Sequence, residues 1–170
     1  MAVPKPRPDI SSFELPDEAA TAALARDLAA HARAGDVIAL TGELGTGKTA
    51  FARAFINALP PPGGAAPDAP EEVPSPTFTL LQTYERAPAP VWHFDLYRLA
   101  RPADAWELGF EEALGQAILL IEWPERLGPL LPAERLDVCF AFGKAPDARR
   151  VSLLGSGDWP ARLRTLGRHD

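Results

Sequence analysis

The first third of the chain carries apolar residues with a helical period. Within residues 17–34 they recur three or four positions apart, at Ala20, Ala23, Leu24, Leu28 and Ala32. This spacing places them on one face of a helix. Acidic residues at 17 and 18 suit the first turn of such a helix, and Gly35 suits its end. The pattern therefore predicts an amphipathic helix over 17–34 that turns back toward the next element.

Continuous apolar runs predict buried strands. Residues 37–40 read Val-Ile-Ala-Leu, and residues 117–121 read Ala-Ile-Leu-Leu-Ile before Glu122. Uninterrupted runs of this length are typical of parallel strands that are covered on both faces. Two further strands are predicted at 78–84 and 91–95. The Pro-containing link between them is too short for a crossover helix, so these two strands should pair antiparallel.

The remaining patterned segments are short. Two short helices are predicted at 102–108 and 111–114, a hairpin that closes the sheet at 136–142 and 150–154, and a C-terminal helix at 159–166. Helices alternate with apolar strands except where the two hairpins interrupt the succession. The pattern predicts an α/β protein with a mixed, mainly parallel central sheet and antiparallel hairpins.

Two stretches have no apolar pattern. Residues 1–12 contain Lys5 and Arg7 but no apolar segment after them, which predicts a flexible tail rather than a secretory signal. Residues 60–74 are rich in Pro, Gly and Ala, and we expect a surface loop there because proline neither continues a helix nor pairs within a sheet. The 170-residue chain is short for two domains, so residues 13–170 should form a single domain.

Composition narrows the class of protein. The chain has 17 Lys and Arg against 23 Asp and Glu, a net charge of −6. This charge disfavours a protein that grips nucleic acid phosphates by itself. No apolar run approaches the roughly eighteen residues of a membrane span, so no membrane association is expected. The single cysteine, Cys139, lies among apolar residues and predicts a buried thiol without a disulfide. These features favour the cytoplasm.

Candidate chemistry begins directly after residues 37–40. Gly42 to Thr49 reads G-E-L-G-T-G-K-T, the phosphate-binding P-loop pattern, and a helix-forming run follows at 50–56. Glycines let the backbone wrap around an anion, and the N–H groups and dipole at the helix start favour phosphate. Lys48 is predicted to reach the β- and γ-phosphates, and the Thr49 hydroxyl to bind Mg²⁺. We therefore expect a P-loop NTPase-like, three-layer α/β/α fold with a nucleotide site.

The contacts to the nucleotide should come from the second half of this loop and from the helix start. These residues are Gly45, Thr46, Gly47, Lys48, Thr49 and Ala50. Switch-type GTPases usually read guanine with an N-K-x-D segment. The only asparagine, Asn57, belongs to the helix expected after the P-loop. Adenine is therefore favoured, and the predicted cofactors are ATP and Mg²⁺.

Two acids follow predicted strands. Asp95 closes the strand at 91–95, and Glu122 closes the run at 117–121. A P-loop site needs a second group to hold Mg²⁺, typically an acid at the end of a neighbouring strand, and Mg²⁺ prefers such hard oxygen ligands. Each acid can bind the metal directly or through water, or polarise the attacking water. The alternative is a strand-end acid at the surface.

Four further side chains leave alternatives open. Thr77 follows a stiff Pro-Ser-Pro segment and is either ordered by the γ-phosphate and Mg²⁺ or simply solvated. Glu18 approaches the nucleotide or complements the helix dipole, and the dipole role is favoured. His93 is interpreted as a strand residue satisfied by a neighbour rather than as a ligand or base. Trp123 packs against either the nucleotide region or the core.

Four segments together resemble the motifs of one family. They are Gly42–Thr49, S-P-T-F-T-L at 75–80, H-F-D-L-Y-R-L at 93–99 and I-E-W-P-E at 121–125. In this order they resemble the TsaE (YjeE) family of bacterial P-loop ATPases, which belong to the biosynthesis of threonylcarbamoyladenosine in tRNA. The resemblance covers roughly residues 15–154. The Pro-rich stretch at 60–70 departs from it, because the family has a shorter linker there.

The resemblance implies a Mg²⁺-dependent ATPase that is weak alone and stimulated by partners. Such a protein assists the TsaB–TsaD complex, which transfers a threonylcarbamoyl group to adenosine 37 of tRNAs that read ANN codons. The implied partners are the TsaD and TsaB proteins, and tRNA only indirectly through that complex.

The resemblance also implies roles for individual residues. Lys48 and Thr49 form the P-loop pair, and Thr49 and Glu122 are the Mg²⁺ ligands. Asp95 is an essential acid near the metal, and Thr77 belongs to a switch-like segment. Lys48, Thr77, Asp95 and Glu122 are therefore the catalytic candidates.

Two positions at the far side of the nucleotide follow from the same resemblance. Glu18 matches a nucleotide-contacting position. The family has a late arginine near the nucleotide, and Arg149 and Arg150 compete for this role here, with Arg149 taken as the candidate.

Two other functions remain as alternatives. A small-molecule or nucleoside kinase on the same fold would transfer phosphate to an acceptor, but the sequence has no compact Arg cluster after a helix to act as a lid. A nucleotide-binding module without hydrolysis would bind ATP and show no turnover beside its partners.

Overall fold

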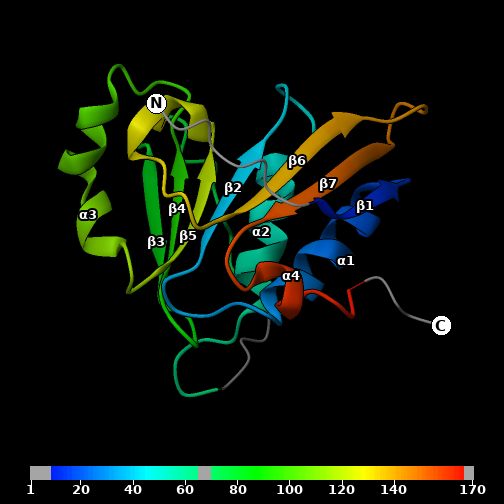
Figure 1. The fold of residues 1–170 in the computed structure, drawn as a ribbon, viewed down its shortest axis with the longest axis horizontal. Helices are drawn as coiled ribbons and strands as arrows, with labels where there is room; N and C mark the ends of the chain where they lie inside the picture. The colour runs from blue at the N-terminus through cyan, green and yellow to red at the C-terminus, as the bar shows by residue number, and fades with distance from the viewer. Residues whose placement is uncertain (1–8, 65–69, 167–170) are drawn as a thin grey trace.

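Seven strands form one sheet in the computed structural model, which describes residues 9–64 and 70–166 (Figure 1). In chain order they are β1 (Asp9–Leu15), β2 (Val37–Thr41), β3 (Leu81–Tyr84), β4 (Val91–Asp95), β5 (Ile118–Glu122), β6 (Leu136–Phe142) and β7 (Arg149–Gly155). The order across the sheet is β1-β7-β6-β2-β5-β4-β3. The four central strands are parallel, and the outer pairs β1–β7, β7–β6 and β4–β3 are antiparallel. The predicted P-loop NTPase-like α/β fold is confirmed.

Helices cover both faces of this sheet and create two apolar cores (Figure 1). The helical segments are α1 (Glu18–Ala29), α2 (Lys48–Ala58), the 3₁₀ helix η1 (Pro102–Leu108), α3 (Phe110–Ala113), the 3₁₀ segment η2 (Pro124–Leu130) and α4 (Trp159–Arg162). Helices α1 and α2 pack against each other on one face, and α3 with the 3₁₀ segments covers the other. Along β5, Leu120 faces the first core and Leu119 the second, so the continuous apolar run is explained by burial on both sides.

Helix α1 begins where the sequence predicts but ends earlier. The Asp17 carboxylate accepts a hydrogen bond from the Ala20 N–H at 2.9 Å, which caps the first turn. The helix stops at Ala29 rather than at residue 34. Beyond Ala29, the Asp36 carboxylate accepts a hydrogen bond from the Arg33 N–H at 2.7 Å. This N–H therefore bonds to a side chain, which competes with continuation of the helix.

The predicted tail is shorter than expected. Residues 9–12, placed in the tail by their lack of pattern, belong to β1, which pairs antiparallel with β7. The strand lies at the edge of the sheet and is mostly half-exposed, so its sequence lacks the continuous apolar run of the central strands. Residues 1–8 lie outside the described part of the chain.

Strand β3 begins at Leu81, three residues later than predicted. Residues 77–79 instead form turns, and the Leu80 N–H donates to the Pro76 carbonyl at 2.6 Å. Leu80 itself has a φ of 66°, which is incompatible with a strand. The C-terminal helix is also shorter than 159–166, because α4 ends at Arg162. The antiparallel pairing of β3 with β4 and the β6–β7 hairpin are confirmed.

The stretch 60–74 contains no helix or strand in its described parts, and residues 65–69 lie outside them. Its second half is nevertheless attached to α2. The Arg53 side chain donates to the Val73 carbonyl at 2.7 Å, and Val73 is buried. Asn57 exchanges two hydrogen bonds with the backbone of Glu71. The surface loop is therefore held at its C-terminal end.

Cys139 is only half-buried, contrary to the buried thiol that its apolar neighbours predict. It lies on β6 with its side chain within hydrogen-bond reach of Thr41, and burial raises the pKa of the thiol. A raised pKa leaves less of the reactive thiolate, which agrees with a structural role. Separately, no helix among residues 9–64 and 70–166 is long and apolar enough to cross a membrane.

Candidate functional site

The P-loop connects the end of β2 to the start of α2. Gly47, directly before the helix, has a φ of 104°, a conformation that L side chains rarely adopt. A Cβ on Gly42 would lie 2.7 Å from the carbonyl oxygen of Phe140, so only glycine permits this approach to β6. Thr46 is fully buried and its hydroxyl donates to the Glu43 carbonyl at 2.7 Å. The loop is therefore shaped by backbone requirements and by its own internal hydrogen bonds.

Lys48 is 5% exposed and closes the loop from inside. Its amine donates to the carbonyl oxygens of Gly42 at 2.5 Å and of Glu43 at 3.0 Å, and lies 4.3 Å from the centre of the Trp123 ring. Burial lowers the pKa of Lys48, and the carboxylates of Glu122 and other acids partly oppose this shift. The Lys48 amine thus donates to two backbone carbonyl oxygens. Phosphate oxygens can replace these carbonyls as the acceptors.

Thr49, the second residue of α2, contacts the acid at the end of β5. Its hydroxyl donates to Oε1 of Glu122 at 2.9 Å. The other carboxylate oxygen, Oε2, lies 2.7 Å from Nε2 of His93. Glu122 is 2% exposed and His93 is fully buried. The prediction that a neighbour satisfies His93 is confirmed, and that neighbour is Glu122.

The second acid, Asp95, lies beside the first. Asp95 and Glu122 are paired across β4 and β5, so both carboxylates emerge at the same end of the parallel strands. Asp95 accepts a hydrogen bond from the Thr77 hydroxyl at 2.9 Å and from the Tyr97 N–H at 3.1 Å. Ser75 lies 2.8 Å from the Thr77 hydroxyl and extends this chain of hydrogen bonds into the loop. The alternative of a solvated threonine does not hold for this structure.

These side chains surround one cavity of about 300 Å³. The predicted catalytic residues Lys48, Thr77, Asp95 and Glu122 all line it, together with Thr49, Ser75, Leu44 and Trp123. Trp123 has a φ of 58°, and its ring lies 5.0 Å from that of Tyr97 and 4.3 Å from the amine of Lys48. Both alternatives for Trp123 hold in the structure, because it lines this cavity and also packs against the second apolar core. The neighbouring Tyr97 was not among the predicted site residues, although it lies in the segment 93–99 that resembles a family motif.

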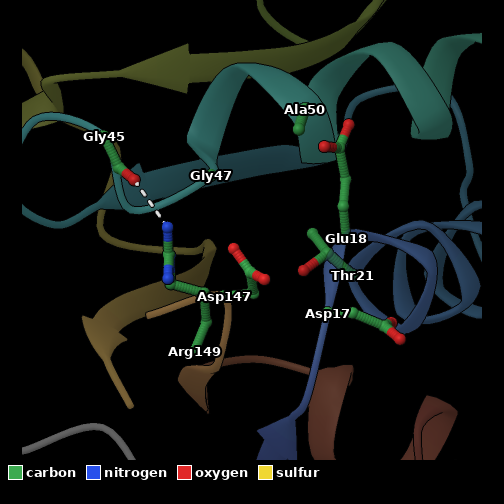
Figure 2. Close-up of a pocket in the computed structure, with 8 residues that line it drawn as sticks. All are labelled: Asp17, Glu18, Thr21, Gly45, Gly47, Ala50, Asp147 and Arg149. Carbon is green, nitrogen blue, oxygen red and sulfur yellow. Dashed lines mark hydrogen bonds between the residues drawn. The ribbon is translucent and has the colours of Figure 1, made fainter. Parts of the chain in front are cut away.

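A second cavity of about 420 Å³ opens on the other side of the P-loop (Figure 2). It is lined by Asp17, Glu18, Thr21, Gly45, Gly47, Ala50, Asp147 and Arg149. Figure 2 shows these residues arriving from the start of α1, from the P-loop and the start of α2, and from the β6–β7 connection and the start of β7. Gly45, Gly47 and Ala50 also line the first cavity, so the two cavities meet at the loop. Pattern reasoning from the sequence missed Thr21 and Asp147, whose residue types carry no signal of their own.

The structure separates the two arginine candidates. Arg149 donates through Nη2 to the Gly45 carbonyl at 3.2 Å and lines the second cavity. Arg150, the next residue on β7, instead pairs with Glu14 of β1 at 2.7 Å. Glu18 also lines this cavity, so its position at the start of α1 allows a contact with a ligand besides the dipole role. Geometry favours Arg149 over Arg150.

The residues at the first cavity fit a small divalent cation. Among residues 9–64 and 70–166, no group of three or more His, Cys, Asp or Glu side chains is arranged to hold a metal ion. Mg²⁺ in phosphate sites needs only one or two protein oxygens, because phosphate and water supply the remaining ligands. The Thr49 hydroxyl and the Glu122 carboxylate are hard oxygen donors 2.9 Å apart at the start of a helix. This pair matches what such an ion requires from the protein.

Comparisons with known proteins agree with one another. The family model described as "Threonylcarbamoyl adenosine biosynthesis protein TsaE" matches residues 15–151. A protein of Rickettsia felis named tRNA threonylcarbamoyladenosine biosynthesis protein TsaE is 40% identical over 124 residues, which cover 73% of this chain and 68% of the relative. The protein of the same name from Bacillus subtilis is 34% identical over 152 residues, 88% of this chain and 89% of the relative.

A solved structure extends this likeness to three dimensions. The crystal structure of YdiB from Bacillus subtilis superposes with a TM-score of 0.74 at 29% sequence identity and covers 94% of this chain and 95% of that one. The range matched by the family model contains the P-loop, both acids, Thr77, Glu18 and Arg149.

Proposed function

The chain belongs to the TsaE family, and on that premise we propose that it binds and hydrolyses ATP in support of threonylcarbamoyl modification of tRNA. The modified position is adenosine 37 of tRNAs that read ANN codons. The partners are the TsaD and TsaB proteins, with tRNA reached only through their complex. A net charge of −6 supports this indirect contact with tRNA.

The observation that carries the proposal is the convergence of Lys48, Thr49 and Glu122 at the P-loop. The Thr49 hydroxyl and the Glu122 carboxylate are in contact at 2.9 Å, directly beside a lysine that already donates to the loop carbonyls. Burying a lysine beside a carboxylate costs desolvation energy, and ionisable groups buried together in a cavity are typical of functional sites. The arrangement is one that a metal-bound phosphate completes.

Each residue has a defined task in this proposal. Lys48 exchanges its two carbonyl partners for oxygens of the β- and γ-phosphates, and the N–H groups from Gly45 to Ala50 donate to the same phosphates. Thr49 and Glu122 would hold Mg²⁺, which when bound neutralises charge on the phosphate oxygens. Asp95 orients the attacking water, and Thr77 returns to or leaves Asp95 as the loop responds to the γ-phosphate.

The second cavity is assigned to the nucleoside part of ATP. Glu18 and Arg149 face it from opposite elements, α1 and β7. Arg149 has a planar guanidinium that can lie against a base or reach a phosphate, and it is held by the Gly45 carbonyl at the junction of the two cavities. On this proposal, the base of ATP lies on the side of the P-loop away from Asp95.

The test is ATP hydrolysis by the purified chain with Mg²⁺, with and without the TsaB–TsaD complex. We expect slow release of inorganic phosphate alone and faster release with the complex. Transfer of the phosphate to a small acceptor instead of water would identify a kinase. ATP binding without turnover in the presence of the complex would identify a binding module. Either result would overturn the hydrolysis proposed here.

A further inference from the structure

We propose that His93 is a positioning residue that presents Glu122 to the Mg²⁺ of the bound nucleotide. The inference rests on the proposed function, since it concerns the same metal. The carrying observation is the contact of 2.7 Å between Nε2 of His93 and Oε2 of Glu122. Both side chains are buried, at 0% and 2% exposure. No other polar residue of β4 lies beneath the site, because Val91 and Phe94 are apolar and Asp95 faces the cavity.

Strand register explains why these two residues meet. His93 is paired with Leu120 and Asp95 with Glu122 across the parallel strands β4 and β5. Side chains two positions apart lie on the same face of a sheet, so His93, Asp95 and Glu122 all point toward α2. His93 lies one layer deeper than Asp95, between the cavity and the apolar core. His93 therefore contacts Glu122 from the side of the apolar core, and Thr49 contacts Glu122 from the side of α2.

The two oxygens of Glu122 are divided between these partners. Oε2 is occupied by His93, and Oε1 is occupied by the Thr49 hydroxyl. A cation bound beside Thr49 therefore meets Oε1 alone. A carboxylate whose other oxygen is held by a buried histidine offers a single, fixed ligand, whereas an untethered glutamate on the same backbone can rotate or chelate. Outer partners of this kind orient metal ligands and are typically worth 10- to 100-fold in metal affinity.

The hydrogen-bond inventory identifies which nitrogen of His93 carries the proton. Nε2 faces a carboxylate oxygen and must donate. Nδ1 is buried and, within the described part of the chain, has no hydrogen-bond partner. The Nε2 proton of the ring therefore supplies the hydrogen bond that holds Oε2 of Glu122.

The experiment measures how much Mg²⁺ strengthens nucleotide binding. Calorimetric titration with a non-hydrolysable ATP analogue gives a Kd with Mg²⁺ and a Kd with EDTA, and their ratio is the magnesium preference. His93→Leu, which removes the donor at similar size, should reduce this preference by about 10-fold or more. His93→Gln, whose amide can donate at a similar reach, should keep it within about threefold. Binding in EDTA should be nearly unchanged in both variants.

Two controls separate positioning from loss of packing. Val91→Ala removes buried volume two residues away on the same face of β4 and should lower the melting temperature without changing the magnesium preference. In a Glu122→Gln background, His93→Leu should have no further effect on that preference, because its action passes through Glu122. A persistent effect in that background would overturn the inference.

The possible failures are distinguishable. If the parent protein binds the analogue equally with Mg²⁺ and with EDTA, the proposed nucleotide function is wrong and the positioning role fails with it. If the parent shows a clear preference that His93→Leu retains, the proposed function stands and only the role of His93 is wrong. A His93→Leu protein too unstable to titrate leaves His93→Gln as the deciding variant: its preference must match that of the parent.

Discussion

Glu122 and Asp95 are paired residues on adjacent parallel strands, yet different parts of the chain hold them. Glu122 receives its hydrogen bonds from Thr49 of α2 and His93 of β4, two elements packed on the core. Asp95 receives one from Thr77, in a segment of turns without helix or strand. Packed elements open only at high free energy, whereas loops open at low free energy. The site therefore has a fixed side around Glu122 and a loop side around Asp95.

Lys48 serves both sides, so removing it should have the largest effect. Lys48→Ala should weaken binding of Mg²⁺-ATP by about 100-fold, since hydrogen bonds to charged groups contribute on the order of 1.5–3 kcal/mol and several are lost together. Calorimetric titration measures the change. Arg101→Ala removes an exposed positive charge near η1 and should leave the affinity unchanged. An unchanged affinity in Lys48→Ala would break the assignment of the whole site.

Neutralising Glu122 and neutralising Asp95 should impair different steps, the first nucleotide binding and the second turnover. Glu122→Gln should weaken Mg²⁺-ATP binding, and Asp95→Asn should leave binding within about threefold but lower partner-stimulated turnover by about 10-fold or more, equal to about 1.4 kcal/mol or more of transition-state stabilisation. Binding and phosphate release are measured on both variants. The comparison between a fixed side and a loop side is wrong if the two variants lose binding and turnover in the same proportion.

Thr77 tests the loop side alone. Thr77→Val keeps the shape and removes one hydrogen bond to Asp95, which is worth about 0.5–1.5 kcal/mol. Stimulated turnover should fall by about 3- to 10-fold, within the range of that energy, while the affinity for ATP in EDTA is unchanged. Ser75→Ala, which removes only the outer member of the chain, should have a smaller effect. Equal effects of Ser75→Ala and Thr77→Val would show that the contact with Asp95 is not the important one.

Substitutions of Arg149 and Arg150 test the second cavity, because neither arginine is bonded to Glu122 or Asp95. Arg149→Ala should weaken ATP binding by a few-fold, about 1 kcal/mol or less, because it loses one partly exposed contact at the second cavity. Arg150→Ala breaks only the exposed pair with Glu14 and should leave ATP binding unchanged. Titration of both variants decides between them, and a greater loss in Arg150→Ala would reverse the assignment.

The smallest effect concerns the pH dependence of stability without ligand. Burial lowers the pKa of Lys48 from 10.5 in the folded protein, so the unfolded chain binds more protons between that lowered pKa and 10.5. The free energy of unfolding contributed by Lys48 should therefore rise as the pH rises through this window. Chemical denaturation at several alkaline pH values measures it. Lys48→Met should remove the rise, whereas Lys144→Met, at an exposed position of the β6–β7 connection, should retain it.

The elements that meet at the site could largely be predicted from the sequence. The continuous apolar run before Glu122 indicated a strand covered on both faces, and the glycine pattern after β2 indicated the P-loop. Both signals come from strong local requirements: burial on two faces, and positive φ beside a helix start. They were sufficient to bring Glu122 and Thr49 to one edge of the sheet.

Other features depend on contacts that no local pattern records. The partnership of His93 with Glu122 joins residues 29 positions apart and depends on β4 being the neighbour of β5. The choice between Arg149 and Arg150 depends on which faces the P-loop and which faces β1. Strand β1 was missed because an edge strand with half-exposed residues has no apolar run. For His93 and the two arginines the missing information is which elements lie side by side, and for β1 it is an apolar pattern that an edge strand does not need.

The attachment of residues 70–74 to α2 limits how far the loop side can travel. Val73 is buried and bonded to Arg53, and Leu81 begins β3, so Thr77 lies four residues from an anchor in each direction. A fully extended chain spans at most about 3.3–3.6 Å per residue, which gives a tether of about 14 Å on either side. Thr77 can therefore leave Asp95 and rebind it while staying close to it. The short segments between Thr77 and its two anchors limit how far the threonine moves. The length of the Pro-rich stretch before Val73 does not.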